Sequence, residues 1–313
     1  MNTASDSTVG ESTVSDSTAR DTRAMAQSAS AADWLKTHAL TPLPQHFLSR
    51  IVFSLTRRRS RFTRAVIEKF ARTYDVDMHD AAEPELSRYD TFNAFFTRAL
   101  TPAARPIATG TDLIASPADG RFSALGDTTD GRLVQAKGID YTILDLLGGD
   151  GEATERLGQG SFATIYLSPR DYHRLHMPLD GQLIRQTHVP GRLFSVGPHA
   201  VRTLDGLFTR NERVVALFET PSGLMALVLV GAINVAAIET VWHGLVTPPK
   251  GRSVSRIDYS GDDRISLAKG DEMGRFNMGS TIVMLTEKSV RWDASLEPEG
   301  AVRMGQSIGT TGE

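Results

Sequence analysis

The pattern of hydrophobic and polar positions changes near residue 100. Before that point, residues 45–64 carry apolar side chains at helical spacing, residues 65–74 are mixed helix formers, and residues 91–100 place their phenylalanines on one stripe. After Pro102, short apolar runs alternate with glycine and proline, a pattern typical of strands. Strands are predicted at 162–167, 214–218, 224–230, 232–238 and 281–285. The pattern predicts an α+β fold with a helical N-terminal segment followed by a mainly antiparallel β core.

The chain is predicted to have three parts. Residues 1–31 are dominated by Ser, Thr, Ala and Asp, a composition that cannot build a core, and they have no apolar stretch of the kind found in a signal peptide. We therefore expect a disordered tail at 1–31, a helical segment at 32–100 and a β-rich domain at 101–313.

The longest uncharged stretch lies between Glu219 and Glu239 and nearly has the length of a membrane span. It is interrupted by Pro221, by Gly231 and by Asn234. Short apolar runs bounded in this way predict two buried strands, and not a helix that crosses a bilayer.

Residues 45–64 combine their apolar stripe with six arginines and no acidic residue. Such a basic amphipathic segment has two interpretations. It packs on the protein with a solvated basic rim, or it lies on a membrane surface. The pattern alone leaves both open.

Composition excludes several kinds of chemistry. The chain has 34 Lys and Arg against 37 Asp and Glu, a formal net charge of -3, which argues against a dedicated nucleic-acid binder. It has no cysteine, so disulfides, thiolate nucleophiles and cysteine-ligated metal sites are ruled out. Covalent catalysis must then use Ser, Thr, Lys or a carboxylate.

Three apparent motifs fail on their context. Residues 158–163 fit a dinucleotide-binding pattern, but the predicted strand follows the glycines instead of preceding them. Residues 305–309 fit a nucleophile elbow, but no histidine follows. His173 and His176 have no evident third ligand, so no metal site is predicted.

Polar groups on stiff turns are the remaining candidates. Asp119 lies in a Ser-Pro-Ala-Asp-Gly turn, His173 and His176 lie in a loop between two prolines, and Ser280 precedes a predicted strand. Catalytic residues favour such positions. Each has an ordinary structural explanation when taken alone, such as an Asx turn for Asp119.

Taken together, these segments resemble the pyruvoyl-dependent phosphatidylserine decarboxylase proenzymes of bacterial type. The likeness covers roughly residues 60 to 310 and rests on four runs: Tyr166 to Pro178, Ile238 to Trp242, Glu272 to Phe276 and Gly279 to Thr281. Met278 departs from the leucine that is usual there, a nearly volume-conserving exchange. The N-terminal tail lies outside the resemblance.

The resemblance implies that the chain cuts itself between Gly279 and Ser280. Ser280 would attack the Gly279 carbonyl, with His176 as base and Asp119 as the group that orients it. Glycine at 279 is expected to allow close approach and backbone angles that a β-carbon would forbid. The products would be a β chain of residues 1–279 and an α chain of residues 280–313.

The resemblance also implies the cofactor and the partners. Ser280 would become a covalent pyruvoyl group that forms a Schiff base with the amine of phosphatidylserine and acts as the electron sink for decarboxylation to phosphatidylethanolamine. His173 is the candidate proton donor. A lipid substrate favours the membrane-surface interpretation of residues 45–64, and thus a peripheral protein on the cytoplasmic side of the cell membrane. The α and β chains would form a heterodimer, with further dimerisation left open.

Two other functions compete with this one. A serine hydrolase would use Asp119, His176 and Ser280 without cutting its own chain. A non-catalytic, membrane-bound β-rich binding module would use none of these residues chemically.

Overall fold

The strands that follow residue 100 assemble into a large antiparallel sheet and three smaller ones, which confirms the predicted α+β class with its β-rich core. The structure is a computed structural model that describes residues 22–24, 29–41, 44–136, 138–233, 237–248 and 253–312. Its helices are α1 (Ala31–Leu40), α2 (Gln45–Thr56), α3 (Thr63–Tyr74), η1 (Leu86–Arg88), α4 (Phe92–Phe96), α5 (Ile143–Leu146), α6 (Gly151–Leu157), α7 (Pro198–Val201), α8 (Leu207–Arg210) and η2 (Gly261–Asp263).

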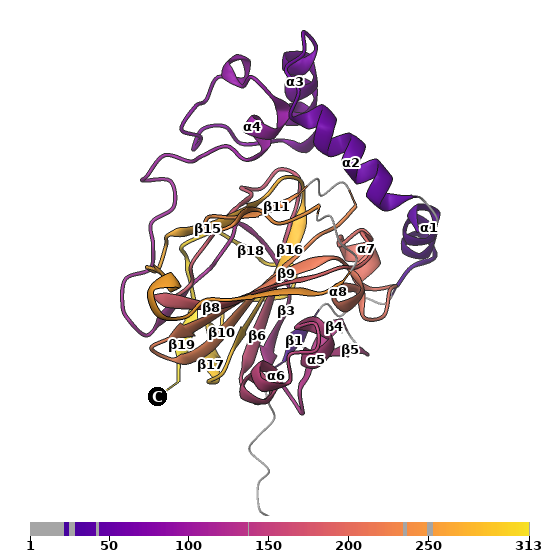
Figure 1. Cartoon of the computed structure of the whole chain (residues 1–313). Helices are drawn as coiled ribbons and strands as arrows, with labels where there is room; N and C mark the ends of the chain where they lie inside the picture. The colour runs from indigo at the N-terminus through magenta and orange to yellow at the C-terminus, as the bar shows by residue number, and fades with distance from the viewer. Residues whose placement is uncertain are drawn as a thin grey trace, which may run out of the picture.

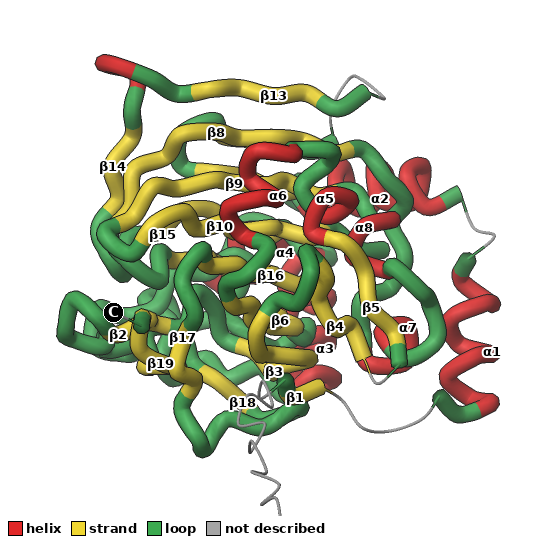
Figure 2. The backbone as a smooth tube through the Cα atoms, turned by 90° about the horizontal axis from the view of Figure 1, so that it is seen from below, coloured by secondary structure: helices red, strands yellow, loops and turns green. Residues whose placement is uncertain are grey.

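The large sheet runs in the order β1-β3-β6-β16-β10-β9-β8-β13, with β14 also paired to β8 and β18 to β3. Figure 2 shows most of these strands following one another across the sheet. Its strands are β1 (Arg23–Ala24), β3 (Gly120–Asp127), β6 (Ser161–Leu167), β8 (Gly181–Val189), β9 (Arg213–Thr220), β10 (Gly223–Val230), β13 (Ser255–Asp258), β14 (Ile265–Leu267), β16 (Ser280–Thr286) and β18 (Ala301–Val302).

Smaller sheets surround the large one. They run in the orders β12-β11-β15-β7, β17-β19-β2 and β4-β5. Their strands are β2 (Leu113–Ala115), β4 (Arg132–Ala136), β5 (Ile139–Thr142), β7 (Arg174–His176), β11 (Ile238–Thr240), β12 (Gly244–Leu245), β15 (Glu272–Phe276), β17 (Val290–Trp292) and β19 (Ser307–Thr311).

The central strands are buried on both faces, which explains why they read as continuous apolar runs. Every residue of β16 is buried, and so is nearly every residue of β6, β9 and β10. The strands predicted at 162–167, 214–218, 224–230 and 281–285 are confirmed as parts of β6, β9, β10 and β16. Helices at both ends and the smaller sheets exclude water from these faces (Figure 1).

The strand predicted at 232–238 is wrong. The chain leaves the sheet at Gly231, whose carbonyl accepts a hydrogen bond from the Asn211 side chain at 2.8 Å and whose N–H donates to the Glu212 carbonyl at 2.8 Å. The bond to Glu212 still follows the register of β9, but Asn211 takes the Gly231 carbonyl and the Glu212 N–H donates to the Arg192 carbonyl at 2.8 Å, so the pairing ends there. Residues 234–236 lie outside the described part, and β11 begins only at Ile238.

The basic segment at 45–64 is not one helix. Helix α2 ends at Thr56, where Arg57 turns back to form an ion pair with Glu239 at 3.1 Å and to cover the Phe53 ring at 3.9 Å. The neighbouring arginines repel one another along a helix, so the run 57–61 favours a break. Helix α3 then confirms the helix predicted at 65–74, and α4 covers only residues 92–96 of the stripe at 91–100.

The predicted tail mostly lies outside the described residues. Within it, Arg23 and Ala24 form β1, which pairs with β3 at the edge of the large sheet, and the Ser30 hydroxyl caps α1 by accepting from the Asp33 N–H at 3.1 Å. The boundary expected at residue 31 therefore falls inside the first helical turn.

The helices α2, α3 and α4 lie together beyond one end of the large sheet, while α5 and α6 lie at the opposite end (Figure 1). A second apolar cluster forms beneath α3 and α4 from Ile67, Ala71 and three phenylalanines, and Met278 packs against it. The helical segment thus reaches the residue two positions before Ser280. Among the described residues, no helix has the length and apolar character needed to cross a membrane.

Candidate active site

Ser280 is the first residue of β16, at the centre of the large sheet. The register places it opposite Leu167 of β6, and the next residue, Thr281, opposite Val230 of β10. Ser280 is fully buried, and within the described part of the chain its Oγ has no hydrogen-bond partner. A buried hydroxyl without a hydrogen bond costs about 1–3 kcal/mol of stability. It is therefore kept where the protein needs it for another purpose, such as a reaction.

Buried polar atoms of two residues close to Ser280 in the sequence, and of His173, are also unpaired. Within the described residues they include Oδ1 of Asn277, Oγ1 of Thr281 and both ring nitrogens of His173. A pocket of about 270 Å³ borders the same loop and is lined by Met278 and Gly279 together with Phe70, Tyr74, Phe96, Tyr166, Pro169, Ser195, Val196, Gly197, His199, Ala232 and Ile233. Unpaired groups beside a pocket are typical of a reaction site.

Gly279 does not have the structural role expected of it. Its φ lies outside the left-handed region, and a β-carbon built there would lie 3.5 Å from its nearest neighbour, the Leu167 carbonyl oxygen. That is an ordinary contact distance. The uncut chain therefore has room for a side chain at 279, and any need for glycine arises when Ser280 moves toward the carbonyl.

His173 lies just before β7, and its carbonyl accepts from the Phe276 N–H at 3.0 Å. Its imidazole is fully buried and stacks on Phe96 at 4.1 Å between ring centroids. Burial, assisted by the positive charge of Arg98, lowers the pKa of His173 to about 3. The carbonyl groups of Ser168 and Pro169 partly oppose this without forming hydrogen bonds of normal geometry. The ring is therefore neutral at neutral pH.

His176 has different surroundings, because residues three apart in an extended segment point to opposite faces. Its Nδ1 lies 2.8 Å from the Gly270 carbonyl oxygen, and its Nε2 lies 3.1 Å from the Tyr172 hydroxyl. Burial is the main cause that lowers the pKa of His176. This ring is also neutral at neutral pH, with a lone pair on one nitrogen.

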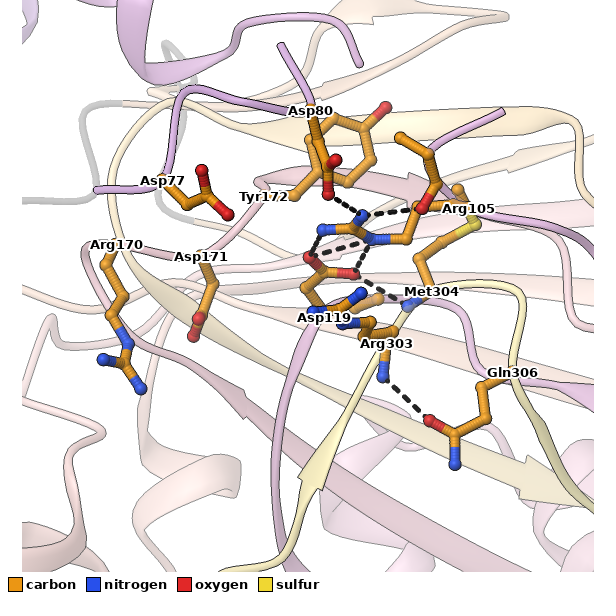
Figure 3. Close-up of polar contacts among 12 residues, drawn as sticks. Asp77, Asp80, Arg105, Asp119, Arg170, Asp171, Tyr172, Arg303, Met304 and Gln306 are labelled. Atoms are coloured by element: carbon orange, nitrogen blue, oxygen red, sulfur yellow. Dashed lines mark hydrogen bonds and ion pairs between the residues drawn. The ribbon is translucent and has the colours of Figure 1, made fainter. Parts of the chain in front are cut away.

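Asp119 precedes β3, and its carboxylate is bound by Arg105 (Figure 3). Arg105 Nη2 donates at 2.6 Å and Nε at 2.9 Å, while the Met304 N–H donates to Oδ1 at 2.8 Å. The remaining side of the guanidinium pairs with Asp80 at 2.8 Å. Hydrogen bonding to Asp119 is the main cause that raises the pKa of Arg105, which stays charged.

The structure does not join the three predicted triad residues by hydrogen bonds. The turn that holds Asp119 is bonded to the backbone of His176, whose N–H donates to the Pro117 carbonyl at 2.9 Å. The expected contact from Asp119 to the imidazole is absent among the described residues because Arg105 and Met304 occupy the carboxylate and Gly270 accepts from the ring. The catalytic roles of these residues remain predictions.

A second cavity, of about 290 Å³, opens beside Asp119 and Tyr172. Its rim combines acids and arginines, including Asp77, Arg170 and Asp171 (Figure 3). Among the residues that the structure describes, no group of three or more His, Cys, Asp or Glu side chains is arranged to hold a metal ion.

Sequence reasoning missed four residues that surround the candidates: Phe96, Arg105, Tyr172 and Gly270. Tyr172 lies inside the histidine-bearing loop and could have been considered from that position. Gly270 lies 94 residues along the chain from its partner His176, and Arg105 lies 14 residues from Asp119; no local pattern marks either residue.

Comparisons with known proteins agree with the geometry. A family model described as phosphatidylserine decarboxylase matches residues 92–310, and one described as PSD matches residues 35–75. The phosphatidylserine decarboxylase proenzyme of Shewanella sp. (strain ANA-3) is 52% identical over 271 residues, which cover 85% of this chain and 93% of the relative. The proenzyme of Shewanella halifaxensis is 51% identical over 271 residues, with coverages of 85% and 94%.

Proposed function

Because the chain belongs to the phosphatidylserine decarboxylase family, we propose that it cuts itself at Gly279–Ser280 and then decarboxylates phosphatidylserine to phosphatidylethanolamine. The observation that carries the proposal is Ser280 itself. Its buried, unpaired hydroxyl starts a central strand, beside a pocket that Gly279 lines.

Self-cleavage needs only groups of this chain. Ser280 Oγ bonds to the Gly279 carbonyl carbon, its proton passes to a base, and the peptide C–N bond breaks to leave an ester. Loss of the Ser280 Cα proton expels the Gly279 carboxylate, and addition of water to the remaining dehydroalanine releases ammonia. We assign the base to His176, whose neutral ring keeps a lone pair on one nitrogen.

Asp119 acts on His176 through its charge in this proposal. Its carboxylate is among the groups that raise the pKa of His176 against the effect of burial. Arg105 keeps that carboxylate fixed next to the Pro117 turn, to which the His176 backbone is bonded. Asp119 is thus an electrostatic partner and not a hydrogen-bonding one in the uncut chain.

The surroundings of Ser280 fit the pyruvoyl group that the family implies. The group would be covalent at position 280, next in the chain to Thr281 and three residues after Asn277, and both of these side chains have a buried polar atom without a partner among the described residues. When present, it supplies the electron sink for the loss of carbon dioxide. His173 is neutral, so its role as proton donor requires an N–H of the neutral ring.

Mass spectrometry tests self-cleavage directly. Under denaturing conditions we expect two chains, residues 1–279 and 280–313, the second lacking the mass of one ammonia. Under native conditions we expect a single complex, because β16 keeps its ladders to β6 and β10 on both sides after the cut. An intact chain that is acylated at Ser280 by an ester substrate would instead support the serine hydrolase, and an intact, unreactive chain the binding module.

We further propose that α2 lies on the membrane surface. Phe47, Ile51 and Leu55 occupy one face at helical spacing and are 63%, 40% and 60% exposed. Arg50, Arg58 and Arg59 are exposed nearby and would attract anionic lipids. Because the substrate is embedded in a bilayer, a face that binds the membrane surface would bring the protein to its substrate. The location on the cytoplasmic side of the cell membrane stays a prediction.

Vesicle binding tests this face. Phe47→Ser combined with Leu55→Ser should weaken binding to phosphatidylserine-containing vesicles at least tenfold, since each fully buried apolar side chain contributes about 1.5–3 kcal/mol. Leu144→Ser is the matched control, because Leu144 is 44% exposed but lies on α5 at the opposite end of the molecule (Figure 1). Equal binding by the double variant and the control in a flotation assay would contradict the assignment.

A further inference from the structure

The orientation of His176 is set by two groups outside the predicted triad. A carbonyl oxygen only accepts hydrogen bonds, so the Nδ1 that lies 2.8 Å from the Gly270 oxygen carries the ring proton. Nε2 then presents its lone pair, and the Tyr172 hydroxyl at 3.1 Å donates to it. The tautomer that a base requires is present without a contact from Asp119.

Both partners are held rigidly. Gly270 has a φ of +88° in a turn closed by the Asp271 N–H and the Ala268 carbonyl at 3.0 Å. Tyr172 is 5% exposed and follows a turn in which the Asp171 carboxylate accepts from the Ser168 N–H at 2.6 Å and from its hydroxyl at 2.7 Å. Neither partner is free to drift from the ring.

We propose that Tyr172 is a positioning residue for self-cleavage: with the Gly270 carbonyl, its hydroxyl holds His176 in the tautomer whose Nε2 takes the proton of Ser280. The inference rests on the proposed function. The Tyr172 hydroxyl first gives up its hydrogen bond to the Nε2 lone pair and keeps its own proton. As the Ser280 O–H bond breaks, that lone pair forms the new Nε2–H bond. Burial raises the pKa of Tyr172 to about 12, so the phenol stays neutral throughout.

The charged groups that face His176 are already paired. Glu272 lies opposite it on β15 and binds Arg174 at 2.9 Å, and Asp119 binds Arg105 at 2.6 Å. Glu272 and Asp119 raise the pKa of His176 and Arg174 lowers it, while burial lowers it most. A hydrogen bond donated to the lone pair stabilises the neutral ring, so it also lowers this pKa. Removing the hydroxyl should raise it.

The test compares precursors made by cell-free synthesis and moved to buffers from about pH 5.5 to 8.5. For Tyr172→Phe we expect the acid limb of the pH–rate profile for cleavage to move to higher pH by about half a pH unit to one pH unit. The plateau rate should fall about threefold to tenfold. Tyr141→Phe is the control, since Tyr141 is equally buried and its hydroxyl lies outside the site.

The outcomes separate this inference from the proposed function. If the unaltered chain is never cut, the proposed function fails. If it is cut and Tyr172→Phe keeps the same rate and pH profile, or loses rate equally at every pH, Tyr172 does not position the base. Nitrogen-15 spectra of the full-length Ser280→Ala precursor give a second measurement that needs no Tyr172 variant. We expect His176 to be protonated on Nδ1, and protonation on Nε2 would overturn the inference.

Discussion

Ser280→Ala is expected to leave the chain uncut and to reduce decarboxylase activity to background. The alanine has no hydroxyl to attack Gly279, so neither the ester nor the dehydroalanine that precedes a pyruvoyl group can form. Folding should be unaffected, because Oγ of Ser280 has no partner within the described residues and its removal leaves no other group unpaired. Denaturing mass spectrometry and release of carbon dioxide from phosphatidylserine measure the two effects.

A control substitution at another serine distinguishes the loss of the reactive hydroxyl from a general effect of mutation. Ser289 follows the other end of β16 and is exposed. Ser289→Ala should be cut and active like the unaltered chain. A Ser280→Ala chain that still yields a fragment beginning at residue 280, or that keeps activity, would show that this serine is not the source of the reactive group.

Arg105→Gln is expected to have the second largest effect. Its guanidinium is 11% exposed and lies between Asp119 and Asp80, so the substitution leaves two carboxylates without their cation. Removing one partner of a buried ion pair costs about 3–5 kcal/mol, and we expect a loss of this size in the free energy of unfolding. Cleavage should also slow, since Asp119 loses its fixed place. Urea unfolding in the Ser280→Ala background keeps the covalent state constant.

Arg156→Gln is the control for Arg105→Gln. Arg156 also joins two acids, Glu219 and Glu287, but its side chain is 34% exposed. Exposed pairs contribute at most about 1 kcal/mol, so this variant should be nearly as stable as the parent. Equal destabilisation by both variants would show that Arg105 contributes no more to stability than Arg156 does.

The stability difference between Arg105→Gln and its parent should depend on pH. The hydrogen bond from Arg105 is the main cause that lowers the pKa of Asp80. A lowered carboxyl pKa contributes stability that is present above the unfolded value, about 3.9, and is lost as the pH falls through the folded value. The Asp80 part of the difference should therefore shrink below about pH 4. A difference that grows on acidification would contradict this account.

Much of the fold follows from local pattern. The apolar runs of β6, β9, β10 and β16 are buried on both faces, so they were visible as continuous strands. The failure at 232–238 came from Asn211, whose side chain takes the Gly231 carbonyl, and from Arg192, whose carbonyl takes the Glu212 N–H. The break after α2 likewise depends on Glu239, which lies far along the chain from Arg57. Contacts of this kind leave no trace in the local pattern.

By itself, the sequence determined the class of fold and the family, and it predicts which serine reacts, because each depends on residue types within short stretches of chain. Only the tertiary structure decided how the candidates are partnered. It bound Asp119 to Arg105 and His176 to Gly270 and Tyr172, and it left Ser280 buried without a partner among the described residues. Hydrogen bonds form between groups that folding brings within about 3 Å, and for these residues that proximity is a property of the whole sheet.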